Sequence, residues 1–445
     1  MENPFAKSVR TRDGLPVLPG AFPLIGHIPM AYRHFPEAMQ KASDLGLGPM
    51  FWITTGFGMW VLLCTTPESL ELFRNKAFTS EHLQEIAPLV AGQSLLSQDG
   101  AAHRHMRGAM NGPFLPRGLS AAKAGAMAAG VLTEMCDRWV AKGSAKVLPE
   151  IQSAALDIMF RMLGVDVGDL EPWRKKYRDL LLANLNVKVR FPGSPAVRSE
   201  KAKAWIDEQL LQILARVRQN PQTDTLLGAM ATAKDEDGQP LTERELLDNT
   251  RLLLLGGHET ISATMAWIAL RLANHPDLWD ELVAEANEGD GVPTTPDQMK
   301  AYPIAESLFR ETVRMHPAFG AITRKAVAPF ELHGRTIPKG ALVAVSLWSI
   351  SHDPAVFPDP MEFRPARFRG RSSQPSSLEI SQFGAGAHFC LGYHLAWLEA
   401  VAFAVALARA ASAKNLRPTL RDPRSMEPIY LPTEHPSPKA IIDLR

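Results

Sequence analysis

Apolar residues recur at helical spacing along most of the chain, which predicts a mainly α-helical protein. The clearest helix begins at Thr242-Glu243-Arg244-Glu245, a capping box in which Thr242 and Glu245 can each accept a backbone hydrogen bond from the other. No proline interrupts it before Pro276, so at about 1.5 Å per residue it would be about 50 Å long. We expect so long a helix, apolar on several faces around residues 252–255, at the centre of the molecule.

Two regions show the denser β-branched and aromatic pattern of strands. Residues 51–55 and 60–65 are separated by Gly56-Phe57-Gly58, which predicts a hairpin, and residues 330–346 form a second strand-rich region. A helical pattern returns at residues 393–411. The chain should therefore combine a large helical part with a small β-rich part.

Composition narrows the class of protein. The 445 residues would allow about three domains, but we find no repeat or linker and predict one domain over residues 1–445. With 46% hydrophobic and 21% charged residues, the chain can bury a sizeable core, which excludes general disorder. The net charge of +1 gives no general attraction to nucleic acid or to a membrane surface.

The cysteines and the N-terminus indicate a cytoplasmic protein. Cys64, Cys136 and Cys390 are too few and too scattered for a disulfide framework, which favours a reducing compartment. No run of about 18 apolar residues follows the N-terminus, so neither a signal peptide nor a membrane anchor is expected.

One cysteine lies in a glycine-rich loop directly before the last helical pattern. A Cys390 thiolate near a helix N-terminus should have a lowered pKa and could bind a metal ion. Gly386 and Gly392 would let the backbone approach a large flat group, and Phe383 could shield the sulfur from water. The alternatives are a buried free cysteine and a zinc site built from His388, Cys390 and His394.

The pattern Phe383-x-x-Gly386-x-His388-x-Cys390-x-Gly392 resembles the haem-binding loop of the cytochrome P450 monooxygenases of the soluble bacterial type. The resemblance implies haem b as the cofactor and Cys390 as the thiolate ligand of its iron. It makes Phe383, Gly386, His388 and Gly392 cofactor contacts, with His388 at a position that is often Arg in the family. It also implies a single cytochrome P450 fold with a large helical lobe, a long central helix and a small β-rich lobe.

Two further elements agree with this family. Glu311-x-x-Arg314 matches its Glu-x-x-Arg signature, and Pro365-Ala366-Arg367-Phe368 matches its Pro-x-Arg-Phe element. By itself the first would be an ordinary ion pair on one helix face. The resemblance implies instead a buried network of Glu311, Arg314 and Arg367 behind the haem-binding loop.

The long helix contains Gly256-Gly257-His258-Glu259-Thr260, which resembles the oxygen-activation motif of the family. Each glycine costs about 1 kcal/mol relative to Ala inside a helix, and close approach of Gly256 and Gly257 to a haem face would explain them. Thr260 could bond its own helix backbone and open a groove, while Glu259 supplies protons, so both are candidate catalytic residues. The alternative is a packed helix crossing, with His258 only a neighbour.

Three basic residues are candidates for the haem carboxylates. His103 and Arg107 match the His-x-x-x-Arg element of the family, and Arg324 precedes the second strand region, where the family places another carboxylate partner. Guanidinium groups suit carboxylates because they can donate two parallel hydrogen bonds.

The resemblance implies a monooxygenase that inserts one atom of O2 into a hydrophobic small molecule such as a terpenoid, polyketide, steroid or fatty acid. A ferredoxin and a ferredoxin reductase would deliver electrons from NAD(P)H to a monomeric enzyme. A peroxide-driven peroxygenase and a non-catalytic haem protein remain alternatives, although the Glu259-Thr260 pair favours the O2-dependent cycle. A basic patch could receive the electron donor, with dispersed surface charge as the equal alternative: Arg104, Arg117, Lys123, Arg369 and Arg371.

Overall fold

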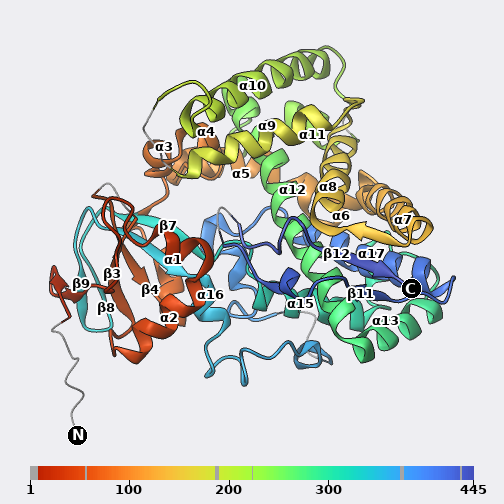
Figure 1. Cartoon of the computed structure of the whole chain (residues 1–445). Coiled ribbons are helices and arrows are strands. Elements are labelled where there is room, and N and C mark those ends of the chain that lie inside the picture. The colour runs from red at the N-terminus through yellow and green to blue at the C-terminus, as the bar shows by residue number, and fades with distance from the viewer. Residues whose placement is uncertain (1–8, 56–57, 186–189, 223, 371–374, 431–432) are drawn as a thin grey trace, which may run out of the picture.

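The computed structural model describes residues 9–55, 58–185, 190–222, 224–370, 375–430 and 433–445. Its α-helices are α1 (Ile28–Arg33), α2 (Phe35–Asp44), α3 (Leu83–Ile86), α4 (Pro88–Ala91), α5 (Gly100–Phe114), α6 (Pro116–Ala121), α7 (Ala124–Lys142), α8 (Val147–Leu163), α9 (Glu171–Leu181), α10 (Pro195–Gln219), α11 (Leu226–Thr232), α12 (Glu243–Asn274), α13 (Pro276–Glu288), α14 (Pro296–Met299), α15 (Pro303–Met315), α16 (Leu347–Ser351) and α17 (Tyr393–Ser412). Figure 1 shows most of them gathered into one helical lobe, with α12 running through it.

The strands form a smaller lobe beside the helices (Figure 1). Its main sheet has the order β3-β4-β10-β7-β5, and the strands β11, β12 and β6 form a separate sheet in the helical lobe. The strands are β1 (Thr11–Arg12), β2 (Leu15–Pro16), β3 (Met50–Thr54), β4 (Trp60–Cys64), β5 (Phe78–Thr79), β6 (Ser144–Lys146), β7 (Ala321–Ala326), β8 (Phe330–Leu332), β9 (Arg335–Ile337), β10 (Leu342–Ser346), β11 (Pro418–Leu420) and β12 (Ile441–Leu444).

Both predicted strand regions are confirmed. The strands β3 and β4 pair antiparallel, with Phe51 opposite Leu63, and the turn residues 56–57 lie outside the described residues. The second region contains β8, β9 and β10, and β10 joins the first hairpin by pairing parallel to β4. On its other side β7, which carries Arg324, pairs antiparallel with β5, so the sheet brings it next to a strand that is far away in the sequence.

The predicted central helix is also confirmed. At its start the Thr242 hydroxyl accepts from the Glu245 amide at 3.2 Å, and the Glu245 carboxylate accepts from the Thr242 amide at 2.8 Å. Residues 261–270 of α12 are all buried, because α8, α15 and α17 pack around this half of the helix. Packing therefore holds the helix in place, so that it can position Gly256, Glu259 and Thr260.

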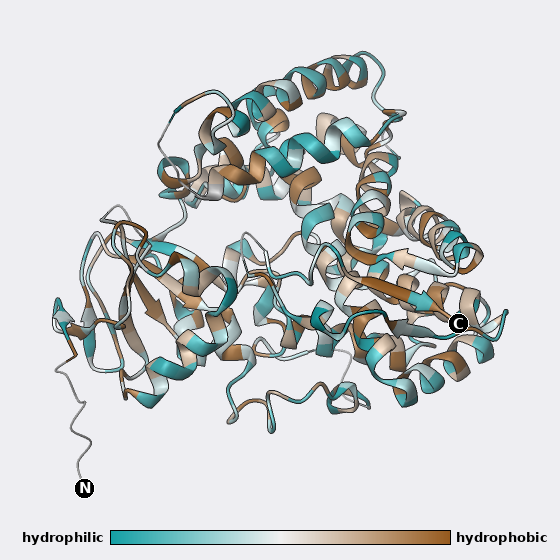
Figure 2. Ribbon diagram, in the orientation of Figure 1, coloured by the Kyte–Doolittle hydropathy of each residue, from teal (hydrophilic) through white to brown (hydrophobic). Residues whose placement is uncertain are grey.

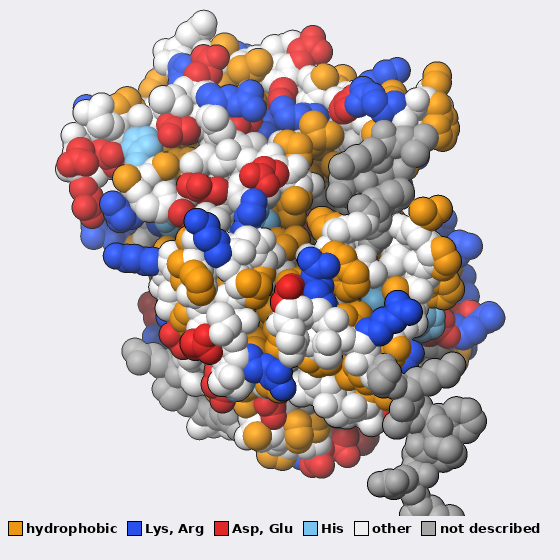
Figure 3. Space-filling view, turned by 90° about the vertical axis from the view of Figure 1, so that its left-hand side faces the viewer, with side chains coloured by type: hydrophobic (Ala, Val, Ile, Leu, Met, Phe, Trp, Pro, Cys, Tyr) orange, Lys and Arg blue, Asp and Glu red, His pale blue; other side chains and the backbone are white. Residues whose placement is uncertain are grey.

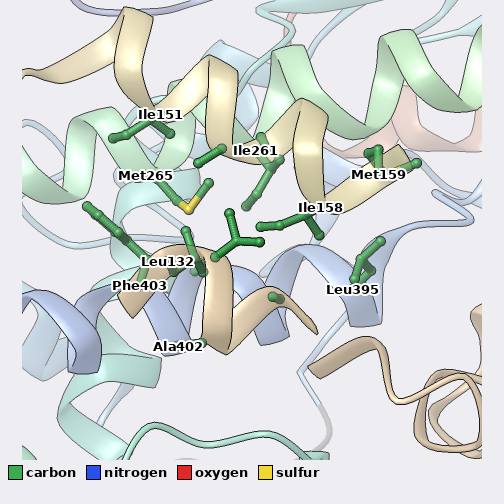
Figure 4. Close-up of a cluster of buried hydrophobic side chains, with 14 of the residues drawn as sticks. Leu132, Ile151, Ile158, Met159, Ile261, Met265, Leu395, Ala402 and Phe403 are labelled. Atoms are coloured by element: carbon green, nitrogen blue, oxygen red, sulfur yellow. The ribbon is translucent and has the colours of Figure 1, made fainter. Parts of the chain in front are cut away.

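The core of the helical lobe lies where α7, α8, α12 and α17 meet. Figure 4 shows Leu132, Ile158, Ile261, Met265 and Phe403 from these four helices converging on one another. Burying a side chain of this size contributes about 1.5 to 3 kcal/mol to the free energy of folding. Surface helices such as α10 and α13 instead alternate hydrophilic and hydrophobic residues (Figure 2).

The helix α17 is apolar on nearly every face, and by length and composition the stretch Gly386–Ser412 could cross a membrane. However, 61% of its most apolar window is buried inside the structure, where α7, α12, α13 and α15 contact α17. A helix that is hydrophobic all round is expected in the core of a large protein. The composition of α17 is explained by this packing.

Candidate active site

The Cys390 loop is stabilised by backbone hydrogen bonds between its own residues and by aromatic contacts. It contains two 3-10 turns, η4 (Ser381–Phe383) and η5 (Gly386–His388), and the Cys390 amide then donates to the Phe383 carbonyl at 2.9 Å. The Phe383 ring packs edge-on against Tyr393, with 4.9 Å between the ring centroids. The loop leads directly into α17, as the sequence predicted.

The Cys390 thiol differs from expectation in its acidity. Burial raises its pKa, and the Gly392 amide and the Arg107 charge only partly oppose this effect. The prediction of a lowered pKa is therefore wrong for the protein alone, because desolvation of the sulfur outweighs the helix terminus. A metal cation on the sulfur would supply the missing positive charge, since a coordinating thiol is deprotonated.

The candidate glycines have different surroundings. A Cβ built on Gly256 would have no atom within 4 Å, whereas one on Gly257 would lie 2.5 Å from Met159 Sδ of α8. A Cβ on Gly386 would lie 2.7 Å from the Phe73 carbonyl, and Gly386 has φ +68°. Gly256 therefore borders open space, while Gly257 and Gly386 permit close packing between protein segments, a role that the sequence did not distinguish.

The predicted network around Glu311 is confirmed. Glu311 and Arg314 are fully buried, and Arg314 donates to both carboxylate oxygens at 2.8 and 2.9 Å. Arg367 Nε donates to the same carboxylate at 3.1 Å, and so does the Arg364 amide at 2.8 Å. The network ties α15 to the chain segment that precedes the Cys390 loop.

The basic candidates come from distant elements. His103 and Arg107 lie on α5 and Arg324 on β7, and His103 Nε2 is buried without a hydrogen-bond partner in the part of the chain that the structure describes. Burial, reinforced by the charges of His388 and Arg107, lowers the pKa of His103 to about 4. Burial also lowers the pKa of Arg324 to about 10. A bound anion could accept a hydrogen bond from the neutral His103 ring, and it would give the buried Arg324 charge an anionic partner.

Asp99 is a site residue that the sequence analysis missed. Its carboxylate accepts from His388 Nε2 at 2.8 Å and from the Thr79 hydroxyl and the Ser80 amide, both at 2.6 Å. Burial favours the neutral acid, but the hydrogen bonds from His388 and Thr79 hold the pKa of Asp99 below its usual value. No sequence pattern indicates this role, since the partners lie as far as 289 positions away.

The predicted hydrogen bond from Thr260 to its own helix backbone is confirmed, whereas α12 is continuous through this turn and the groove stays a prediction. The Thr260 hydroxyl donates to the Gly256 carbonyl at 2.7 Å, one turn back on α12. The neighbouring Glu259 carboxylate accepts from Gln152 Nε2 of α8 at 3.2 Å and contacts His258 Nε2 at 3.1 Å. The Thr260 alcohol, the Glu259 acid and the backbone of Gly256, which has no side chain, therefore lie on the same turn of the helix.

These residues fit an iron porphyrin. Cys390 offers a sulfur ligand, and Gly256 leaves open space of the kind that a flat group needs. Arg107 and Arg324 offer positive charge for carboxylates, and His103 offers a ring nitrogen without a hydrogen-bond partner among the described residues. The zinc alternative lacks support, because the described residues contain no group of three His, Cys, Asp or Glu side chains arranged to hold a metal ion.

Comparison with known proteins decides the family. The family model named Cytochrome P450 matches residues 16–410. The chain belongs to the cytochrome P450 family. The predicted mainly α cytochrome P450 fold is thereby confirmed, and the protein is a haem-dependent cytochrome P450 monooxygenase.

Cytochrome P450 relatives match over most of the chain. The cytochrome P450 BJ-4 homolog of Sinorhizobium fredii is 38% identical over 98% of this chain and 97% of its own length, and cytochrome P450 BJ-4 of Bradyrhizobium diazoefficiens is 37% identical over the same shares. A solved structure, retinoic acid bound cyanobacterial CYP120A1, has a TM-score of 0.84 at 25% identity and covers 97% of this chain and 99% of that chain.

Two more distant cytochrome P450 relatives carry names that state a substrate. Taxane 10-beta-hydroxylase of Taxus cuspidata is 26% identical over 88% of this chain and 83% of its own length. Cyclooctat-9-en-7-ol 5-monooxygenase of Streptomyces melanosporofaciens is 27% identical over 90% of this chain and 89% of its own length.

Proposed function

We propose that the protein hydroxylates or epoxidises a hydrocarbon-rich isoprenoid with O2, using haem b held by Cys390. The hydrogen bond from Thr260 to the Gly256 carbonyl, next to Glu259, carries this proposal, because it places an alcohol beside an acid that could supply protons. When bound, haem with an anionic sulfur ligand supplies O–O bond cleavage and the oxidising power. The protein residues supply binding, orientation and protons.

The proposed haem-binding set follows from the surroundings of each residue. Cys390 is the proposed iron ligand, with Phe383 and Gly392 shaping the loop around its sulfur. His103, Arg107 and Arg324 would bind the haem carboxylates, because His103 Nε2 is buried without a hydrogen-bond partner among the described residues and the two arginines donate only to backbone carbonyls. Gly256 would border the haem face, while Gly257, Gly386 and His388 would act by fixing neighbouring protein segments.

The isoprenoid class rests on the named relatives and on the apolar character of the expected pocket. The names of these proteins mention a taxane, cyclooctat-9-en-7-ol and retinoic acid, all of which are isoprenoids. By resemblance the pocket draws on residues 82–96, 180–191 and 318–322, on Leu252 and Gly256, and on residues 429–431. Residues 186–189 and 431 of these segments lie outside the described residues. A mostly apolar site suits such a ligand.

We also propose a ferredoxin and its reductase as electron donors to a monomeric, cytoplasmic enzyme without nucleic-acid or membrane partners. Arg104, Arg117 and Lys123 are exposed, but Arg369 pairs with Glu281, and Arg371 lies outside the described residues. On the face shown in Figure 3, acidic and basic side chains are interspersed with apolar ones. If the basic patch receives the electron donor, charge reversal at Arg104 together with Lys123 should slow reduction of the enzyme by its ferredoxin more at low salt than at high salt.

The first test removes the sulfur ligand. Wild-type protein should contain haem and show the thiolate-haem absorption in its reduced carbon monoxide complex, whereas Cys390→Ser should lose that absorption. Cys136→Ser is the matched control, because Cys136 is a buried free cysteine of α7 outside the site. A purified wild-type protein without haem, or an unchanged spectrum in Cys390→Ser, contradicts the proposal.

The second test separates the O2-dependent cycle from a peroxygenase. Thr260→Val removes the hydroxyl bonded to Gly256 and should lower product formed per NAD(P)H by about tenfold, while Thr260→Ser should retain most of it. Both variants should bind an isoprenoid substrate with an unchanged spectral shift. Wild-type turnover with peroxide but none with NAD(P)H and redox partners would establish the peroxygenase instead.

A further inference from the structure

Three polar side chains, Arg271, His316 and Glu434, form a buried cluster where three segments of the chain meet. Arg271 Nη2 of α12 lies 2.7 Å from His316 Nε2, and His316 Nδ1 lies 2.6 Å from Glu434 Oε1. His316 directly follows α15 and stacks on the Trp267 ring of α12, with 3.8 Å between ring centroids. The His316 side chain is 7% exposed and the Glu434 side chain 1% exposed. The cluster therefore connects α12, the end of α15 and the C-terminal segment.

The direction of each hydrogen bond in the cluster follows from the arginine. A guanidinium group can only donate, so His316 Nε2 accepts from Arg271. Burial lowers the pKa of His316, so its ring is neutral and carries its one proton on Nδ1. His316 Nδ1 therefore donates to Glu434 Oε1. This bond requires only an accepting oxygen on the side chain at position 434.

Glu434 also joins two segments of the chain through its backbone. The Glu434 amide donates to the Ala318 carbonyl, two residues after His316, at 2.8 Å. Residues 318–322 lead from α15 into β7, and residues 433–435 surround Glu434 in the C-terminal part of the chain. We call these two stretches the anchored segments. The side chain and the backbone of Glu434 together hold both of them to α12.

Both anchored segments border the candidate active site. Burial lowers the pKa of His435 and the charge of Glu259 opposes this effect, which places His435 near the candidate catalytic turn of α12. The other segment ends in β7, where Ile322 and Arg324 lie on the same face, because side chains alternate along a strand. Ile322 is only half-buried, and Arg324 is a candidate haem contact. The anchored segments therefore limit the space that a substrate could occupy at this site.

We propose that Glu434 is a positioning residue that, through His316, fixes the anchored segments to α12 and thereby determines which carbon atom of the substrate is oxidised. This inference rests on the proposed O2-dependent function. Arg271 and Trp267 hold the His316 ring, so the accepting oxygen of Glu434 sets where the segments lie. A displacement of about 1 Å caused far from the reacting atoms can lower a rate by about 100-fold. Small shifts of these segments should therefore change the products that are formed.

Hydrogen exchange measures the anchoring without a substrate. Glu434→Leu and His316→Phe remove the hydrogen bond from opposite ends, and phenylalanine keeps a ring against Trp267. In the haem-loaded enzyme, both variants should exchange the backbone amides of the anchored segments about fivefold to tenfold faster than the wild type, as expected for the loss of one buried hydrogen bond. Glu434→Gln keeps the accepting oxygen and should exchange like the wild type.

Either disrupting variant decides the anchoring alone if the other does not take up haem. Exchange rates like those of the wild type in Glu434→Leu and His316→Phe overturn the proposal.

Turnover then tests the effect on the product. With retinoic acid and geranylgeraniol as isoprenoid probes, Glu434→Leu and His316→Phe should change the ratio of oxidised positions and lower product formed per NAD(P)H by about tenfold. Haem content and the reduced carbon monoxide spectrum should remain those of the wild type. The double variant should add no further change, because both substitutions remove the same hydrogen bond.

Glu285→Leu is the matched control for a general loss of stability. Glu285 of α13 is also buried, and its carboxylate accepts from the amides of Ile304 and Ala305 at 2.5 and 2.9 Å. Its removal should lower stability and leave the product ratio unchanged. An unchanged ratio in Glu434→Leu, or an equal change in Glu285→Leu or Glu434→Gln, overturns the positioning role. Absence of O2-dependent product from both probes in the wild type would instead remove the proposed function, and hydrogen exchange would still decide the anchoring.

Discussion

Two buried groups that lack a hydrogen-bond partner among the described residues, His103 and Glu399, differ in their surroundings. His103 Nε2 lies among basic groups, and a haem carboxylate would complete its hydrogen bonding. Glu399 of α17 is fully buried, and neither carboxylate oxygen has a hydrogen-bond partner in the described part of the chain. Burial raises the pKa of Glu399 to about 8, so the folded protein holds this side chain as a neutral acid at pH 7.

Glu399 should make the protein less stable as the pH rises. The unfolded chain loses the proton near pH 4.5, but the folded chain keeps it until about pH 8, so stability falls across that window and is level above it. Glu399→Gln should match the wild type at pH 5 and exceed it at pH 9 by up to about 5 kcal/mol. Urea unfolding of the holoenzyme at both pH values checks this, with the exposed Glu208→Gln of α10 as control. An equal gain in the free energy of unfolding at both pH values would contradict this explanation.

Helix contacts in the core depend on small residues at particular positions. Gly125 and Gly130 both lie on α7, but they face different surroundings. A Cβ on Gly125 would lie 1.9 Å from the Thr294 carbonyl oxygen and 3.1 Å from a methyl group of Leu398 on α17, whereas one on Gly130 would meet nothing within 4 Å. The close packing of α7 against its neighbours therefore requires a glycine at position 125 but not at position 130.

Alanine substitutions should separate these two glycines. Gly125→Ala should destabilise the fold by about 1 to 3 kcal/mol, because the carbonyl of Thr294 cannot move as a flexible side chain could. Gly130→Ala should stabilise it by up to about 1 kcal/mol, because alanine is the better helix former. Urea unfolding midpoints measure both effects, and a Gly125→Ala protein as stable as the Gly130→Ala protein would contradict the packing account.

Across the whole molecule, a few polar residues join segments that are distant in the sequence. Glu311 gathers Arg314, Arg367 and the Arg364 amide around one carboxylate. Arg314 also donates to the carbonyls of Ser351 and Pro360, at 3.0 and 2.8 Å. The helical lobe and the segment leading to the Cys390 loop are thus fastened at one buried point.

Glu311→Gln should weaken that attachment. It leaves two buried arginines without their carboxylate, a change that costs about 3 to 5 kcal/mol in such networks. We expect lower stability and protein that purifies with little haem, measured by the ratio of haem absorbance to protein. Glu306→Gln on the same helix is the control, because its carboxylate lies 3.9 Å from Arg310 and is 30% exposed. Normal haem content in Glu311→Gln would contradict this role.

Sequence patterns predicted most of the fold, because capping, turns and helical periodicity are local. The capping box at Thr242, the hairpin of β3 and β4 and the helix after Cys390 all occur where the pattern placed them. The motif residues were likewise found from short spacings.

The different roles of the residues within the site could be assigned only from the tertiary structure. Asp99 binds His388 across 289 positions, and Gly257 differs from its neighbour Gly256 only because Met159 of α8 packs against it. The Cys390 pKa was misjudged because desolvation depends on every segment that encloses the sulfur. The sequence by itself determined the family, the central helix and the candidate thiolate, because each depends on residues that are close together in the chain. Which side chains meet, and how burial shifts their charges, was decided only when the chain folded.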